Sequence, residues 1–157
     1  MTHALALKIC ELVSILLLTW VSGMYWGPWL ALSRSMSVFE PDVYLAVVDR
    51  MRRNMAPLMT VLTPIALLST VPVLFLTYHG RPAAFALTLT SLILFAVTLI
   101  VTMSVEVPIV TQISTWTVPT MPENWPQLRD RWGAFHLARI VPSFVGLALL
   151  LVAAICD

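Results

Sequence analysis

Residues 83–105 read AAFALTLTSLILFAVTLIVTMSV, a run of 23 residues without a single charge. A helix that crosses the hydrocarbon core of a bilayer needs about 20 consecutive apolar residues, so this run predicts a transmembrane helix. Three further uncharged stretches cover residues 12–33, 55–78 and 140–156. The last of these reaches a full span if it begins near Phe135 and contains His136 and Arg139. No stretch alternates like a membrane β-strand, and we expect an all-α protein, an integral membrane four-helix bundle.

The composition supports the same class. The chain has 157 residues, of which 59% are hydrophobic and only 11% are charged, whereas soluble domains have about half apolar and about a quarter charged residues. So few charges cannot cover the surface of a soluble enzyme, and so many apolar residues exclude a disordered chain. The formal net charge of +1 leaves no basic surface for nucleic acid. We therefore expect membrane lipid to surround the protein.

We predict a single domain over residues 1–157. Its transmembrane helices should cover about residues 4–32, 43–78, 83–107 and 132–156. A tight turn at residues 79–82 joins the second helix to the third, and a long Pro-containing connection over residues 108–131 joins the third to the fourth. The prolines of this connection are Pro108, Pro119, Pro122 and Pro126. They disfavour a continuous helix there, although the pattern can become helical again from Trp125.

Four helices place both termini on one side of the membrane. Most arginines fall toward the other side, and cytoplasmic connections are enriched in positively charged residues. We therefore expect an integral protein of a bacterial cytoplasmic membrane, in which the first and third connections face the cytoplasm. Such a bundle is also compatible with a homo-oligomer.

The two cysteines, Cys10 and Cys156, fall near the terminal ends of the first and last helices. A disulfide between them is conceivable if these helices are neighbours. We favour the simpler interpretation, in which they are two small apolar side chains of a helix bundle.

Ionisable residues concentrate at one end of the predicted bundle, and charges inside a membrane span are costly enough to mark functional sites. The fourth helix begins with a stripe at spacings of 3, 4 and 3 that consists of Arg129, Trp132, His136 and Arg139. Glu106 follows the uncharged run of the third helix, and we expect it to pair with Arg139. The second helix begins with a polar face that contains Arg50, Arg53 and Asn54. At the opposite end, we expect a local ion pair between Lys8 and Glu11.

These residues also have a structural interpretation. Tryptophans at a membrane boundary form aromatic belts, which would account for Trp26, Trp29 and Trp125, and arginines there contact lipid phosphates. A lone histidine is often a hydrogen-bonded structural residue. A Trp–His–Arg stripe beside a carboxylate is harder to explain in this way, so we favour a functional pocket.

The residue types favour acid–base chemistry on an apolar ligand. His136 is a suitable general base, and Arg139 and Arg53 can stabilise a developing oxyanion. Glu106 would orient His136 or neutralise Arg139. A hydrophobic small-molecule substrate would be contacted by Asn54, Gln112, Trp116, Arg129 and Trp132. We predict no cofactor; a haem or a transition metal held by His136 is the alternative, and the carboxylate set of a di-iron bundle is missing.

Several segments resemble a known family. Residues 106–116, EVPIVTQISTW, are followed by Trp125 and by the pattern R-W-x-x-x-H-x-x-R over residues 131–139. Residues 54–57, NMAP, and residues 23–27, GMYWG, add to the likeness. Together they resemble the anthrone oxygenase-like family of small four-helix membrane proteins, which is also catalogued as a domain of unknown function. The R-W-x-x-x-H-x-x-R pattern is the most specific part of the resemblance.

The resemblance implies oxygenation of an anthrone to an anthraquinone with O₂, without a dedicated cofactor. Many relatives carry paired asparagines where this chain has Val110, Thr111 and Gln112. Our leading hypothesis is a membrane oxidoreductase, an oxygenase that acts on a hydrophobic aromatic or quinone-like small molecule with O₂. One alternative is a non-enzymatic binding or assembly module for a lipid, haem or partner protein. The other is a copper- or iron-dependent membrane oxidase in which His136 and Glu106 are ligands.

Overall fold

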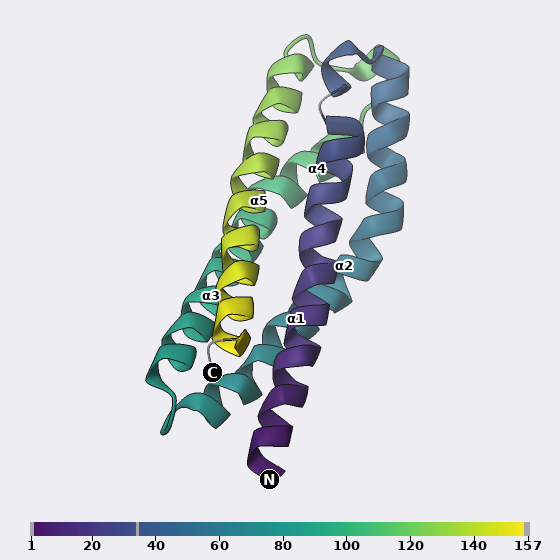
Figure 1. The fold of residues 1–157 in the computed structure, drawn as a ribbon. Coiled ribbons are helices and arrows are strands. Elements are labelled where there is room, and N and C mark those ends of the chain that lie inside the picture. Colours follow the sequence, from purple (N-terminus) through teal and green to yellow (C-terminus); the bar gives the residue numbers. More distant parts are fainter. Residues whose placement is uncertain (1, 34, 156–157) are drawn as a thin grey trace.

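The computed structural model describes residues 2–33 and 35–155, and most of these residues are helical (Figure 1). The first helix, α1 (Thr2–Pro28), continues into a π-helical turn, η1 (Trp29–Ser33). After a short 3₁₀ turn, η2 (Met36–Val38), comes α2 (Pro41–Thr77). The third long helix consists of α3 (Pro82–Val101), the π-helical turn η3 (Thr102–Glu106) and α4 (Val107–Ile113). A second 3₁₀ turn, η4 (Val118–Thr120), precedes α5 (Trp125–Ile155).

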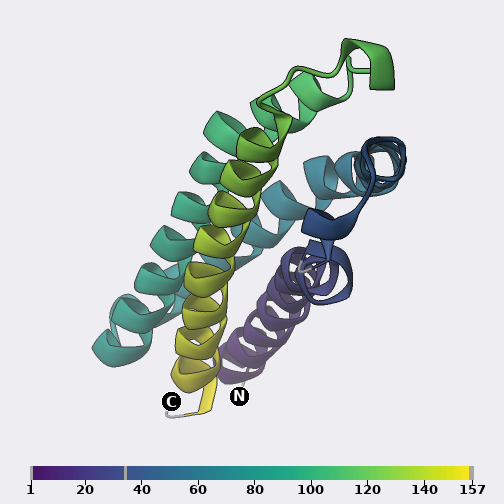
Figure 2. The ribbon, with the colours of Figure 1, turned by 90° about the horizontal axis from the view of Figure 1, so that it is seen from above.

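These elements form four long helices that are apolar enough to cross a membrane. The most extensive packing joins α3 to α5 and α1 to α2, and α1 also packs on α5 (Figures 1 and 2). Two side chains of α1 reinforce this arrangement: Lys8 donates to the carbonyl of Ala154 at 2.9 Å, and Ser14 donates to that of Ser69 at 2.7 Å. The described residues contain no strand. The expected all-α membrane four-helix bundle is therefore confirmed.

The helices are longer than the hydrocarbon core of a bilayer. The 37 residues of α2 rise by roughly 55 Å at about 1.5 Å per residue, whereas that core is about 30 Å thick. The charged residues Asp49, Arg52 and Arg53 lie near the start of α2 and pair with one another through Asp49. The bundle is therefore longer than the hydrocarbon core, and these charged residues lie toward its end that carries η2 and η4.

The connection between the third and fourth helices is shorter than we expected. Instead of covering residues 108–131, it covers residues 114–124, because the third helix continues to Ile113 and α5 begins at Trp125. Pro108 does not end the helix, and the π-helical turn η3 directly precedes the short helix that contains it. Here the N–H of Val107 bonds to the carbonyl of Thr102, five residues earlier. This widened turn accommodates a proline, which has no N–H and would clash with the carbonyl of a regular α-helical turn.

The apolar interior has two parts. One part lies in the spans, where Gly146 of α5 allows close packing on α3: a Cβ there would meet the Phe95 ring at 3.0 Å and the Ser91 carbonyl oxygen at 3.3 Å. The second part caps the bundle at the end that carries η2. It is a cluster of six buried side chains: Met36, Tyr44, Val48, Ile109, Ile113 and Trp132. Trp132, a member of this capping cluster, lies beside His136 of α5, with 5.9 Å between the ring centres.

Two predictions concern the opposite end of the bundle. The ion pair between Lys8 and Glu11 is confirmed, with a distance of 3.1 Å between Nζ and Oε2. Cys10 carries a free thiol, and Cys156 lies outside the described residues.

Candidate functional site

The stripe predicted on the fourth helix faces the interior. Trp132, His136 and Arg139 are all buried on α5, because spacings of four and three residues keep them on one side of the helix. Arg139 is only 8% exposed, and His136 only 2%. A charged side chain at such a position requires partners, and the partners of Arg139 define the candidate site.

Arg139 is held by three helices. Its Nη2 lies 3.1 Å from Oε2 of Glu106 and 2.7 Å from Nδ1 of His136. Its Nη1 donates to the hydroxyl of Thr102 at 3.1 Å, and its guanidinium carbon lies 4.6 Å from the centre of the Tyr25 ring. The predicted pair of Glu106 and Arg139 is thereby confirmed. Charge neutralisation, hydrogen bonds and a cation–π contact together offset the cost of burying the guanidinium.

The partners of His136 assign its tautomer. Its Nε2 lies 2.9 Å from the backbone carbonyl oxygen of Tyr25, which can only accept a hydrogen bond. Its Nδ1 faces the guanidinium of Arg139, which can only donate. The imidazole therefore carries its hydrogen on Nε2 and presents a lone pair on Nδ1. Oε2 of Glu106 lies 3.7 Å from that Nδ1, close enough to stabilise a positive charge on the ring.

Both side chains from the third helix come from the turn η3. Thr102 and Glu106 are its first and last residues, and both contact Arg139. A π-helical turn advances by about one extra residue and often marks a functional site. In this protein, η3 sets the two groups that bind the guanidinium.

Four buried polar atoms at this end have no hydrogen-bond partner within the described residues. They are Oε1 of Glu106, Nε of Arg139, Nε1 of Trp132 and the hydroxyl of Tyr44. Buried polar groups in proteins are nearly always paired, so ordered water or a ligand should complete these atoms. The other unpaired buried atoms of the described residues are spread over Glu11, Ser22, Thr88 and Ser91. The Trp132 and His136 rings lie 5.9 Å apart between their centres.

A small cavity opens beside Trp132. It has a volume of about 210 Å³ and is lined by Met36, Ser37, Arg129, Asp130, Trp132 and Gly133. The side chain of Arg129 is 13% exposed; it pairs with Asp130 at 2.9 Å and lies over the ring of Trp125 at 5.2 Å. Arg129 therefore belongs to this cavity, one helical turn outside the buried cluster.

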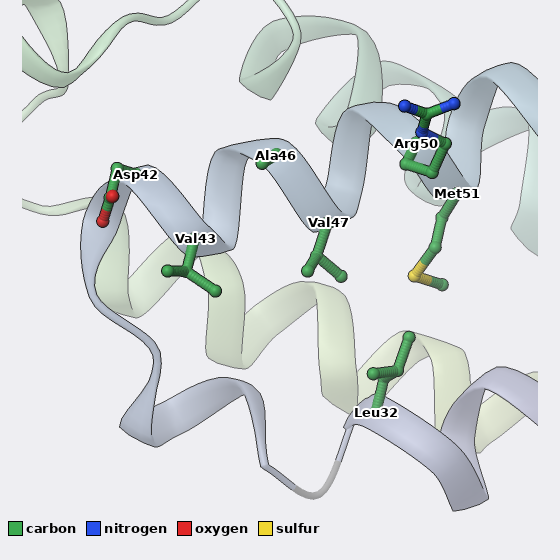
Figure 3. A pocket seen from close by; sticks show the side chains of 7 residues that line it. All are labelled: Leu32, Asp42, Val43, Ala46, Val47, Arg50 and Met51. Atoms are coloured by element: carbon green, nitrogen blue, oxygen red, sulfur yellow. The ribbon is translucent and has the colours of Figure 1, made fainter.

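A larger, open groove of about 430 Å³ lies along the first turns of α2. Figure 3 shows Val43, Val47 and Met51 pointing from α2 toward Leu32, while Arg50 extends from the other side of the helix. The groove contains none of the buried polar residues described above.

The structure does not bring every predicted site residue to the cluster. Arg53 is exposed and pairs with Asp49 at 2.8 Å, and Asn54 and Gln112 are also exposed. Trp116 packs at the margin of the capping cluster. The expectation that Arg53 would stabilise an oxyanion together with Arg139 therefore lacks the necessary geometry, because the start of α2 turns its polar face outward.

Three residues at the site were not among the predicted site residues. Tyr25 contributes a backbone carbonyl and a ring face, Thr102 contributes a hydroxyl, and Tyr44 contributes an unpaired hydroxyl. Thr102 precedes Glu106 by four residues, a spacing that places both on one helix face, and this signal could have identified it. The carbonyl of Tyr25 has no signature in the sequence.

Comparison with known proteins adds one finding. The family model described as anthrone oxygenase matches residues 50–149, more than half of the chain. The protein belongs to the anthrone oxygenase family. No curated protein and no solved structure matches the chain.

The anthrone oxygenase segment contains most of the cluster. Thr102, Glu106, Trp132, His136 and Arg139 all lie within the matched residues, whereas Tyr25 and Tyr44 precede them. The described residues contain no group of three or more His, Cys, Asp and Glu side chains suited to a metal. His136 and Glu106 are the two ligands that a metal-dependent oxidase would use, and the guanidinium of Arg139 lies against both.

Proposed function

We propose that the protein is a membrane-embedded oxygenase that removes a proton from a hydrophobic aromatic or quinone-like small molecule and lets the resulting carbanion react with O₂. The observation that carries this proposal is the buried contact of a neutral His136 with Arg139, which is itself paired with Glu106. In this buried environment, His136 supplies a base, Arg139 supplies a partner for an oxyanion, and Glu106 supplies the counter-charge. Membership of the anthrone oxygenase family supports the reaction class.

The substrate must first free the base. Without a ligand, the lone pair on Nδ1 of His136 accepts an N–H of Arg139. A ligand carbonyl that accepts this N–H would take the guanidinium away from Nδ1. The imidazole could then receive a proton, and Oε2 of Glu106 at 3.7 Å would stabilise the imidazolium. The net charge of the site stays at zero throughout, because the new imidazolium balances the new oxyanion.

An anthrone illustrates the balance of the reaction. Its central ring has a carbonyl opposite a CH₂ group; His136 takes one proton of that group, and the electron pair of the broken C–H bond delocalises onto the carbonyl oxygen near Arg139. O₂ takes up two electrons in single-electron steps and bonds to the same carbon. The peroxide recovers the proton from His136. Loss of the second hydrogen as a proton and cleavage of the O–O bond then give the second carbonyl and one water per O₂.

The test is oxygen consumption by the purified protein on an anthrone. We expect His136→Ala to lower turnover by at least about 100-fold, the smallest contribution typical of a general base, while the variant still folds and extracts normally. His79→Ala is the matched control, because His79 is exposed in the turn between α2 and α3. Turnover retained by His136→Ala would contradict the proposal.

The same preparation separates the alternatives. A stoichiometric partner that co-purifies, without oxygen uptake on any quinol or anthrone, would identify a binding or assembly module. A haem absorbance or a fixed metal content that disappears in both His136→Ala and Glu106→Ala would instead identify these residues as ligands.

A further inference from the structure

Two unpaired hydrogen-bond donors lie on the cavity side of the site. The hydroxyl of Tyr44 and the indole N–H of Trp132 have no partner within the described residues, although Tyr44 is 0% exposed and Trp132 only 5%. Both belong to the capping cluster. A donor buried without a partner is costly, and two of them in one packed cluster point to an acceptor that comes from outside the chain.

The surroundings of these donors form a polar chamber. Trp132 lines the 210 Å³ cavity together with Arg129 and Asp130. The hydroxyl of Tyr44 is close enough to Arg129 and Asp130 to feel the charge of both. Tyr44 does not line this cavity, but its ring packs against that of Trp125 at 5.2 Å, and Arg129 lies over the same Trp125 ring. Both donors therefore lie around Arg129.

The reacting groups follow Trp132 along the buried face of α5, and neither His136 nor Arg139 lines the cavity. Trp132 and Arg139 are seven residues apart on the same face of α5, which is about 10 Å along the helix axis, and the His136 ring lies between them, 5.9 Å from that of Trp132. A flat fused-ring molecule has the shape to extend from Arg139 to Trp132 across the imidazole. Such a ligand would place one end at the guanidinium and the other at the two donors.

We infer that Tyr44 and Trp132 form a second anchor, which binds an oxygen atom at the far end of a fused-ring aromatic ligand while Arg139 binds the oxygen at the reacting end. The inference deepens the proposed function and rests on it for the chemistry at the reacting end. It makes a phenol oxygen on an outer ring, remote from the oxygen that Arg139 binds, the feature by which the site selects its ligand.

The binding of two matched probes tests this anchor without turnover. The probes are 9,10-anthraquinone and 2-hydroxy-9,10-anthraquinone, whose hydroxyl lies at the end of the long axis away from both ketones. Their binding to the protein in nanodiscs is measured by equilibrium partition against empty nanodiscs. We expect the wild type to bind the hydroxylated probe about tenfold more tightly, since one or two hydrogen bonds are worth about that factor. Tyr44→Phe and Trp132→Phe, which remove only the donors, should each reduce this preference to about threefold.

Exposed residues of the same types provide the controls. Tyr78→Phe and Trp20→Phe, at positions 60% and 68% exposed, should retain the tenfold preference. The inference is overturned if the wild type shows no preference, or if both Tyr44→Phe and Trp132→Phe retain it, which would mean that the two donors hold only structural water.

The two proposals fail in different ways. If the preference is present and Tyr44→Phe reduces it, but wild-type protein consumes no O₂ on an anthrone, the anchor stands and the oxygenase reaction does not. If His136→Ala abolishes turnover and the preference is absent, the reaction stands and the anchor does not.

Discussion

Arg139 shows how a single charge organises this end of the bundle. The cost of burying a guanidinium in a membrane span made Glu106 its predictable partner, and the two groups lie 3.1 Å apart. Sequence reasoning also identified His136 and Trp132 through their spacing. It could not identify the carbonyl of Tyr25, because every residue has a carbonyl and only tertiary packing selects one of them. The structure places Arg53 at the surface, paired with Asp49, because helical spacing shows which residues share a face but not which way that face turns.

The buried ion pair gives a prediction at the scale of one residue. Glu106→Gln keeps the size of the side chain but leaves the guanidinium of Arg139 without a counter-charge, and we expect a loss of about 3 kcal/mol in the free energy of unfolding. Denaturant titration in detergent measures it. Asp49→Asn is the control, because Asp49 pairs with Arg52 and Arg53 on the surface, and it should leave the unfolding midpoint unchanged.

A double variant shows whether the loss comes from the unbalanced charge. Glu106→Gln combined with Arg139→Gln should be more stable than the sum of the two single losses predicts. Strict additivity would mean that the two side chains do not interact across the 3.1 Å contact.

At the scale of elements, the four spans were predictable and the ends of two helices were not. Uncharged runs of sufficient length leave few alternatives to transmembrane helices. The end of the third helix was placed at residue 107 because Pro108 usually stops a helix, and the compensating turn η3 has no clear sequence signature. The same turn sets the positions of Thr102 and Glu106 against Arg139.

A proline substitution tests the role of η3. Pro108→Ala restores a backbone N–H and permits a regular α-helical turn, which would shift Glu106 relative to Thr102 and to Arg139. We expect oxygen uptake on an anthrone to fall about tenfold or more, by loss of preorganisation, with no loss of thermal stability. Pro72→Ala, in α2, is the control and should leave oxygen uptake unchanged. Full activity in Pro108→Ala would show that the proline does not maintain the turn.

The packing of α3 on α5 gives a second test at this scale. Gly146→Ala would place its Cβ 3.3 Å from the Ser91 carbonyl oxygen and 3.0 Å from the Phe95 ring, and we expect destabilisation by about 1–3 kcal/mol. Gly23 of α1 has no atom within 4 Å of an added Cβ, so Gly23→Ala should be neutral or stabilising. A scan of unfolding midpoints in detergent compares the two; equal effects would contradict the close approach.

At the scale of the whole molecule, the site lies toward one end of the bundle rather than at its middle. The four long helices have 30 to 37 residues and are longer than the hydrocarbon core of a bilayer. The cavity beside Trp132 is near one end of the bundle, next to the connection that contains η2. A hydrophobic ligand dissolved in the membrane could therefore reach the cluster close to the headgroups. The arginines and tryptophans of the sequence predicted at which end of the bundle the candidate site lies. The depth of the site could not be predicted, because it depends on the exact lengths of the helices.

The orientation of this end is also testable. We predict that the connections over residues 34–40 and 114–124 face the cytoplasm. After replacement of Cys10 and Cys156 by serine, Thr115→Cys should react with a membrane-impermeant maleimide only in inside-out vesicles, and Gly80→Cys only in spheroplasts. The reverse pattern would place the site at the outer face of the membrane.

The hydrogen bond between His136 and the backbone of residue 25 has a consequence for any mutational scan. Since the acceptor is a main-chain oxygen 2.9 Å from Nε2, every amino acid at position 25 supplies it equally. Saturation mutagenesis there would report only on the ring that covers Arg139, and a tolerant profile would conceal the contact that fixes the tautomer. To expose this contact, the peptide bond itself must be altered, for example by an ester replacement at the carbonyl of Tyr25, which weakens the acceptor and leaves every side chain in place.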